Sequence, residues 1–365
     1  MPKPEKHSRR AFLQGRAAAR VLAGKAQDLV DSAVARMELA TPSASTLHLH
    51  ASRRAMACEF AVQYHVSAGE VSDEVMAAFD LIEELEDQMT IYRDQSAVID
   101  INQKAADGPV AVEARLYSLL ELAGRLHQAT GGAFDITSSP LSRVWGFLRR
   151  EGRLPSEEEI SEAMGWVGFD NVTLNAAEQS IRFGMSGLEI NLNSIGKGFA
   201  LDQVALFLDE RGLTNYLWHG GSSSVLARGI NQSDPQQAWT LGLRHPLQPE
   251  RRLAEFHLRD QALGTAGGGT QFFEHEGKRY SHILDPRTGW PAEGVFTSTV
   301  IAPTAAEADA LATAFYVMGV ETVEKYCAAH PEIGALLVCS MTDSPEVVLH
   351  AFGLNSQDWT RCDFN

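Results

Sequence analysis

The sequence has few cysteines, a shortage of basic residues and no long apolar run. Its four cysteines show no CxxC or Cys/His spacing, so neither a zinc motif nor a disulfide framework is indicated: Cys58, Cys327, Cys339 and Cys362. Lys and Arg number 31 against 47 Asp and Glu, and the resulting net charge of −16 argues against a nucleic-acid-binding surface. No apolar segment is long enough to cross a membrane. We expect an acidic, soluble protein whose 365 residues are enough to bury a substantial core.

The first 50 residues are predicted to form a segment separate from the rest. Residues 8–13, SRRAFL, resemble a twin-arginine export signal. The apolar region that should follow such a signal is interrupted by three basic residues, Arg16, Arg20 and Lys25. A basic amphipathic helix is the alternative, and residues 41–45 are typical of a linker. We therefore expect a domain at residues 51–365 and a cytoplasmic location, with export to the periplasm as the alternative.

The most informative stretch runs from Ser281 to Gly319. Its first part, SHILDPRTGWP, predicts a turn, because Asp-Pro and Thr-Gly favour backbone angles that other residues resist. The β-branched run at residues 297–302 predicts a buried strand. A helix should follow, since Thr304 and Glu307 have capping-box spacing and Gly319 is a typical C-terminal stop.

Two oxygen-bearing residues on this predicted helix suggest a metal site. Asp309 and Thr313 are four residues apart, so their side chains should share one face of the helix. A carboxylate and a hydroxyl at that spacing suit Mg²⁺, which takes oxygen ligands and shares them with phosphates. In the alternative interpretation, Asp309 only complements the helix N-terminus and Thr313 only packs. Two ligands do not identify a metal site, so spacing alone leaves both interpretations open.

Three blocks of the sequence resemble one enzyme family. YSHILDPRTGWP, followed by a strand and EADALATAF, resembles the C-terminal signature of the FAD:protein FMN transferases, the ApbE-type family. TGGAFDIT with PLSRVWGF after it, and LEINLNSIGKGFALD further on, are similar to two other blocks of that family. The resemblance extends from about Met56 to Cys339. It implies an α+β fold in which helices flank a mixed, mainly antiparallel sheet.

The resemblance also implies which residues contact FAD. We expect these contacts at Met56, Tyr92, Ala133, Phe134, Asp135, Asn191, Lys197, Thr265, Gly267 and Leu284. Read from the residues alone, Met56 would be core packing, Tyr92 an ordinary half-buried aromatic, and TGGAFD a helix C-cap before a strand. Lys197 lies in the predicted turn between a strand and a helix, where a pyrophosphate can be held.

Two of the blocks depart from the family pattern. Asn191 stands where the family has a flavin-contacting Asp, and Asn193 replaces the first Gly of that block. An Asn in place of Asp keeps an acceptor but loses a charge, so nucleotide affinity or metal pairing can differ. Residues 265–269, TAGGG, replace TSGDY, and such a glycine run favours either close backbone approach to a ligand or a flexible loop.

The activity that the resemblance implies is transfer of FMN from FAD to a Thr or Ser hydroxyl of an acceptor flavoprotein, with release of AMP. Mg²⁺ would be held by Asp309, Thr313 and the main-chain carbonyl of Ser194. His282 is our candidate for the general base, because its free pKa suits that role. Asp285 either orients His282 or caps the turn.

Two alternatives remain at this point: an FAD pyrophosphatase of the same fold, and a non-catalytic flavin-binding or carrier protein. The presence of Asp309, Thr313, Lys197 and His282 favours an enzyme over a carrier.

Overall fold

The structure, a computed structural model, describes residues 38–39, 48–65, 71–269, 271–341 and 344–362. The twin-arginine-like segment and the linker expected at residues 41–45 lie outside the described residues. Within the described part of the chain, the helices are too short or too polar to span a membrane.

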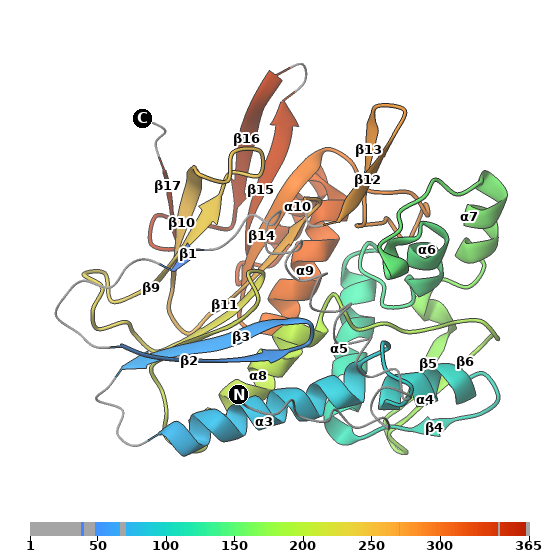
Figure 1. Cartoon of the computed structure of the whole chain (residues 1–365), viewed down its shortest axis with the longest axis horizontal. Helices are drawn as coiled ribbons and strands as arrows, with labels where there is room; N and C mark the ends of the chain where they lie inside the picture. Colours follow the sequence, from blue (N-terminus) through green and yellow to red (C-terminus); the bar gives the residue numbers. More distant parts are fainter. Residues whose placement is uncertain (1–37, 40–47, 66–70, 270, 342–343, 363–365) are drawn as a thin grey trace, which may run out of the picture.

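An eight-stranded sheet forms the centre of the molecule (Figure 1). Its strand order is β16 (Ser344–Phe352), β15 (Gly334–Met341), β14 (Val295–Ala302), β11 (Ala262–Gly267), β8 (Ser224–Arg228), β7 (Tyr216–Gly220), β3 (Cys58–His65) and β2 (His48–Ala55). Each neighbouring pair in this sheet is antiparallel. The predicted α+β class with a mainly antiparallel sheet is confirmed.

Helices cover one face of this sheet and enclose the larger hydrophobic core (Figure 1). The helices that contact its strands are α3 (Ser72–Met89), α8 (Gly196–Asp209), α9 (Ala305–Met318) and α10 (Val320–Ala329). Helix α4 (Ala97–Lys104) packs against α3, and α5 (Ala114–Ala129) packs against α9. Helix α9 lies in the middle and touches its neighbours backbone to backbone. A Cβ on Gly198 of α8 would lie 2.0 Å from the carbonyl oxygen of Ala305, and one on Gly264 of β11 would lie 2.3 Å from that of Ala308. Glycine is therefore required at both positions.

A second sheet covers the opposite face of the large sheet. It has the order β1 (Glu38–Leu39), β9 (Trp239–Arg244), β10 (Arg252–Leu258) and β17 (Trp359–Arg361), and the two sheets enclose a second apolar core. Strand β1 belongs to the segment expected to be separate, yet it pairs with β9. The division of the chain at residue 50 stays a prediction.

The remaining elements gather beside the ends of the large sheet. They are the hairpin β12 (Phe272–His275) and β13 (Lys278–Ser281), the three-stranded sheet β4 (Val110–Ala111), β6 (Ser180–Phe183) and β5 (Val172–Asn175), the helices α6 (Ser139–Val144) and α7 (Glu157–Met164), and the 3-10 turns η2 (Phe147–Arg149) and η3 (Phe169–Asn171). The buried indole of Trp145 donates to the carbonyl oxygen of Gly289 at 2.8 Å. This bond joins the PLSRVWGF block to the DPRTG turn, so two blocks far apart in sequence form one aromatic-rich unit.

The local predictions from the 281–319 stretch hold with one change. Thr304 is the N-cap of α9 and its hydroxyl accepts from the N–H of Glu307, while Gly319 ends the helix at φ 72°. The carboxylate of Glu307 accepts from the Thr304 hydroxyl rather than from its backbone N–H, so only half of the capping box forms. The TAGGG block differs more, because Thr265, Ala266 and Gly267 belong to the central strand β11 and are not part of a flexible loop.

Candidate functional site

The carboxylate of Asp309 joins three elements at the centre of the candidate site. Its Oδ2 accepts hydrogen bonds from the backbone N–H of Gly198 in α8 and from the hydroxyl of Ser224 in β8, each at 2.8 Å. The side chain is buried, with 7% of its surface exposed. Burial raises the pKa of Asp309 to about 6, while the positive charge of Lys197 acts in the opposite direction.

Asp309 caps a helix, but not its own. It contacts the N-terminal turn of α8, where backbone N–H groups lack partners within the helix. The reverse contact also exists: Asp202 of α8 accepts from the N–H groups of Ala305 and Ala306 at the start of α9, at 2.8 and 2.9 Å. Burial raises the pKa of Asp202 to about 7. Each helix thus supplies a buried carboxylate that caps the other helix. The sequence analysis did not identify Asp202 as a functional or capping residue.

The residues present at Asp309 fit a hard cation. Both recorded hydrogen bonds of Asp309 go to Oδ2, and within the described chain no donor is recorded for Oδ1. The hydroxyl of Thr313 donates to the carbonyl oxygen of Asp309 at 3.3 Å, which leaves its own lone pairs available. Ser194 lies in the turn that leads into α8. Carboxylate, hydroxyl and carbonyl oxygens are the ligands that Mg²⁺ takes, and a cation here would offset the cost of burying the Asp309 charge.

Lys197 stands in the first turn of α8, next to this carboxylate. No ion pair is recorded for its ammonium group in the part of the chain that the structure describes. The helix N-terminus adds its own partial positive charge. Lys197 and the α8 N-terminus together form a place where a negatively charged phosphate group would be stabilised.

His282 lies at the end of β13 and is held by a main-chain carbonyl. Its ring Nδ1 is 3.0 Å from the carbonyl oxygen of Gln271, and its backbone N–H donates to the same oxygen at 3.0 Å. Burial lowers the pKa of His282 below its ordinary value, so the ring is neutral at pH 7. A carbonyl only accepts hydrogen bonds, so Nδ1 carries the proton and Nε2 carries the lone pair that a general base needs.

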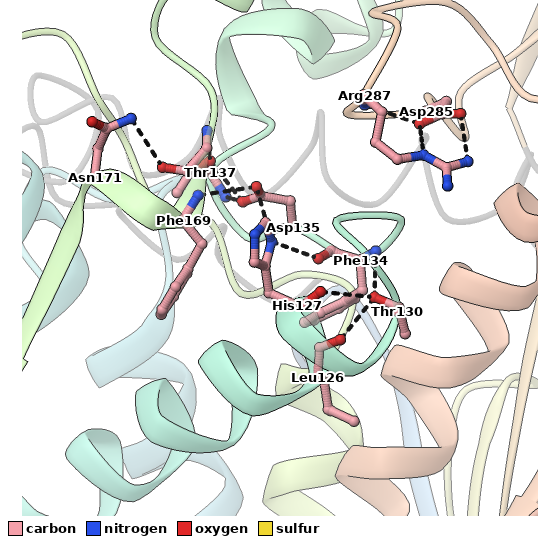
Figure 2. A network of polar contacts seen from close by, with 11 residues as sticks. Leu126, His127, Thr130, Phe134, Asp135, Thr137, Phe169, Asn171, Asp285 and Arg287 are labelled. Carbon is pink, nitrogen blue, oxygen red and sulfur yellow. Dashed lines mark hydrogen bonds and ion pairs between the residues drawn. The ribbon is translucent and has the colours of Figure 1, made fainter. Parts of the chain in front are cut away.

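Among the described residues, no hydrogen bond or ion pair is recorded between Asp285 and His282. Its carboxylate pairs with the guanidinium of Arg287, with Nε and Nη2 each 2.8 Å from a carboxylate oxygen, and it also accepts from the Arg287 N–H (Figure 2). Its carbonyl oxygen accepts from the N–H groups of Thr288 and Gly289, which closes the turn. Of the two roles considered for Asp285, these contacts favour capping the turn.

Tyr92 and the altered 191–194 turn lie together on the surface. Tyr92 follows α3 and is 64% exposed, more than the half-buried position that the residues alone suggest. Its hydroxyl accepts from the side-chain amide of Asn193 at 2.6 Å. The side chain of Asn191 accepts from the backbone N–H of Asn193 at 2.9 Å, so it shapes the turn. Both asparagines that depart from the family pattern therefore have structural contacts next to an exposed ring.

Met56 occupies a strained turn. Met56 and Ala57 connect β2 to β3 with φ angles of 48° and 60°, a conformation that usually calls for Asn or Gly. The N–H of Met56 donates to the carboxylate of Glu86 in α3 at 2.8 Å, which helps to hold the turn. Strain of this kind is found preferentially at ligand sites.

The Ala133–Phe134–Asp135 step is buried. Figure 2 shows Phe134 and Asp135 within a network of polar contacts. The Asp135 carboxylate accepts from the N–H and hydroxyl of Thr137 at 2.7 and 2.6 Å and from the N–H of Phe169 at 3.1 Å. It also lies 3.2 Å from Nδ1 of His127, and this contact raises the pKa of His127. With its oxygens so occupied, Asp135 orders the loop, and any ligand contact at this step would use the backbone.

A pocket of about 450 Å³ opens beside this network. His127, Gly132 and Asp135 line it from the end of α5, Gly168 lines it from the residues before η3, and Arg287 lines it from the DPRTG turn. No sequence pattern singled out His127, because a histidine in a helix is commonly structural. The pocket shows that the TGGAFD and DPRTG blocks meet in space.

The other expected FAD-contacting residues sit at the edges of these groups. The Thr265 N–H donates to the carbonyl oxygen of Ser223, one residue before the Ser224 that contacts Asp309. Gly267 ends β11, and the buried Leu284 packs with Trp145 in the aromatic unit. Recorded hydrogen bonds and ion pairs of the described residues connect Asp309 with the α8 turn, and His282 with Gln271, but do not connect these two groups with each other.

The chain is similar in sequence to a family of known proteins. The family model described as ApbE family matches residues 56–337. Proteins named FAD:protein FMN transferase from Treponema pallidum and Vibrio cholerae are 31% and 33% identical to the chain. The first match covers 77% of this chain and 81% of the relative, and the second covers 66% and 72%.

Solved structures agree with the sequence matches. The flavin transferase ApbE from Vibrio cholerae superposes with a TM-score of 0.74 at 28% identity, over 86% of this chain and 98% of that one. The ApbE protein from Thermotoga maritima gives a TM-score of 0.73 at 28% identity, over 84% and 97%. The expectation of a transferase agrees with the names of these relatives.

Proposed function

The chain belongs to the ApbE family, and on that premise we propose that it transfers FMN from FAD to a threonine or serine hydroxyl of an acceptor flavoprotein and releases AMP. The observation that carries the proposal is the match over residues 56–337 to relatives named FAD:protein FMN transferase. The contacts around Asp309 and His282 support it, because they supply the two things such a transfer needs: charge neutralisation and a base.

The proposed reaction is a displacement at the phosphorus of the FMN half of FAD. The acceptor hydroxyl oxygen forms the new P–O bond, the bond to the AMP oxygen breaks, and AMP leaves. Such reactions depend mostly on positioning and on neutralising charge at the phosphate oxygens. Lys197 and the N-terminus of α8 would hold the pyrophosphate.

We propose that Asp309, Thr313 and the Ser194 carbonyl hold a Mg²⁺ ion. The open Oδ1 of Asp309 and the oxygen-only ligand set support this assignment. When bound, the ion would supply Lewis-acid polarisation of the pyrophosphate. Asp309 accepts from Ser224 and also from Gly198 at the start of α8. The same carboxylate would therefore bind the cation and position the helix end that is proposed to bind phosphate.

His282 is proposed as the general base. Its Nε2 carries a lone pair because Nδ1 donates to the Gln271 carbonyl, and a neutral ring is ready to accept the acceptor's hydroxyl proton. Threonine and serine are poor nucleophiles while protonated, so a transferase needs this group more than a flavin carrier does. His282→Ala should leave FAD affinity within a few-fold and lower flavin transfer by about 10²–10⁴-fold.

The remaining proposed FAD contacts come from several elements. Exposed Tyr92 offers a ring for stacking, and Ala133–Asp135, Thr265 and Gly267 are proposed to line the FAD site. Asn191 acts through the turn that it stabilises, and Met56 and Leu284 contribute apolar contact.

The test is to incubate the protein with FAD, Mg²⁺ and candidate acceptor flavoproteins, and to measure AMP release and in-gel flavin fluorescence of the acceptor. We expect AMP in proportion to fluorescent acceptor. Equal release of AMP and FMN with and without acceptor would indicate an FAD pyrophosphatase instead. Binding of FAD with release of neither product would indicate a flavin carrier.

A further inference from the structure

Gln271 holds His282 with its backbone and is itself held by its side chain. The Gln271 carbonyl oxygen accepts from both the ring Nδ1 and the backbone N–H of His282, each at 3.0 Å. The side-chain amide of Gln271 donates to the carbonyl oxygen of Phe147 at 2.8 Å. Gln271 immediately precedes β12 and His282 immediately follows β13, so these bonds lie at the base of the hairpin.

The anchor of the Gln271 side chain is a rigid part of the molecule. Phe147 begins η2 and is buried against Trp145, with the two rings stacked at 6.5 Å. The Phe147 ring also meets the His282 imidazole edge to face, with centroids 6.4 Å apart. The buried ring of Phe147 touches one side of the imidazole, and its carbonyl fixes the residue that bonds to the imidazole nitrogen.

The hairpin is not part of a larger sheet in the described chain, and side-chain contacts join it to the rest of the protein. Strands β12 and β13 pair only with each other among the described strands, and an isolated two-stranded hairpin is marginally stable in water. Phe273 and Tyr280 pack onto Trp145, but Phe272 on the other face is 41% exposed. Any shift of β12 relative to η2 would move the Gln271 carbonyl away from the imidazole.

We propose that Gln271 is a positioning residue: its side-chain bond to the Phe147 carbonyl keeps its own carbonyl on Nδ1 of His282 and so maintains the tautomer with a free Nε2. The catalytic consequence rests on the proposed function, in which His282 is the base. The tautomer itself does not rest on it. In many proteins a carboxylate orients a functional histidine, whereas here a main-chain carbonyl and a neutral amide would do so. Asp285 is then not needed to orient His282, and its carboxylate pairs with Arg287.

The test compares two variants of Gln271 with a control. Gln271→Leu removes the amide donor and keeps most of the volume, and Gln271→Glu keeps the shape but cannot donate when ionised. Gln232→Leu is the control, because Gln232 is exposed and has no recorded side-chain bond. The His282 tautomer is read from ¹⁵N–¹H correlation spectra of the protein without FAD, with the His282 signal assigned by its loss in His282→Ala.

We expect the wild type and Gln232→Leu to show a single His282 tautomer protonated at Nδ1. Both Gln271 variants should show the Nε2-protonated form as well. Transfer should fall by about 10- to 100-fold in kcat with the KM for FAD unchanged, the usual effect of removing a group that orients a functional histidine. Gln271→Glu serves if Gln271→Leu fails to fold.

The outcomes separate the two proposals. A Gln271 variant that folds, keeps the Nδ1-protonated tautomer and retains full transfer would overturn the positioning role while the proposed function stands. An altered tautomer in a protein that shows no transfer in the wild type would support the positioning role and overturn the proposed function. A rise in the KM for FAD with no change of tautomer would make Gln271 a ligand contact or a structural residue, and the inference would be wrong.

Discussion

Replacing Asp309 by asparagine should stabilise the metal-free protein while removing its response to Mg²⁺. Asparagine keeps the shape and retains an oxygen that can accept from the Gly198 N–H and the Ser224 hydroxyl. What it removes is a negative charge that burial makes costly, since the pKa of Asp309 is raised from 3.8 to about 6. The ionised carboxylate therefore lowers the free energy of unfolding of the metal-free protein. Such a loss of stability is a recurrent feature of functional sites.

The magnitude and its pH dependence follow from linkage. Below pH 3.8 Asp309 is protonated in both folded and unfolded states and costs nothing. As the pH rises toward 6 the unfolded state ionises first, so the folded state binds more protons and loses stability. Above about pH 6 the loss is complete, at about 3 kcal/mol when each pH unit contributes 1.36 kcal/mol. For a chain of this size that corresponds to a rise in Tm of about 4 °C in Asp309→Asn.

Thermal unfolding monitored by circular dichroism, with EDTA, at pH 8 and pH 4 tests this. Asp309→Asn should be more stable than wild type at pH 8, and the difference should shrink at pH 4. Adding MgCl₂ should raise the Tm of the wild type only, because binding to the folded state stabilises it. Equal stability of the two proteins at pH 8 would refute the reasoning about burial. An equal rise in Tm with MgCl₂ would refute Asp309 as a metal ligand.

Three further results are expected. Gly198→Ala should lower stability by at least about 1–3 kcal/mol in a thermal melt, because its Cβ would meet the Ala305 carbonyl oxygen at 2.0 Å; Gly108→Ala, with nothing within 4 Å, is the matched control, and equal melts would contradict the α8–α9 contact. Tyr92→Ala should leave the melting curve unchanged but weaken FAD binding about 3- to 10-fold in a fluorescence titration, as expected for one lost aromatic stack; unchanged affinity would exclude a stacking role. The transfer rate measured against pH should be flat down to pH 6.5 and fall only below it, since burial lowers the pKa of His282; a fall that begins above 6.5 would mean that another group is the base.

Elements with local signals were predictable from the sequence. The helix expected after Thr304 begins there and ends at Gly319. Strand β14 contains the β-branched run expected at residues 297–302. These succeed because caps and side-chain periodicity act over a few residues. The glycine-rich 265–269 block left two alternatives open, close backbone approach to a ligand and a flexible loop. The structure places residues 265–267 in β11, so the flexible loop does not apply to them.

The family resemblance, the fold class and the residue types that carry the proposed chemistry could all be read from the sequence. The bonding partner of each residue depends on how the chain folds in three dimensions. Asp202 and Ala305 are 103 residues apart, and Asp309 and Gly198 are 111 apart, so the reciprocal caps exist only once α8 and α9 pack together. Likewise, the Phe147 carbonyl reaches Gln271 across 124 residues. No local pattern encodes such pairs, because a buried polar group takes whichever partner the folded chain brings within reach.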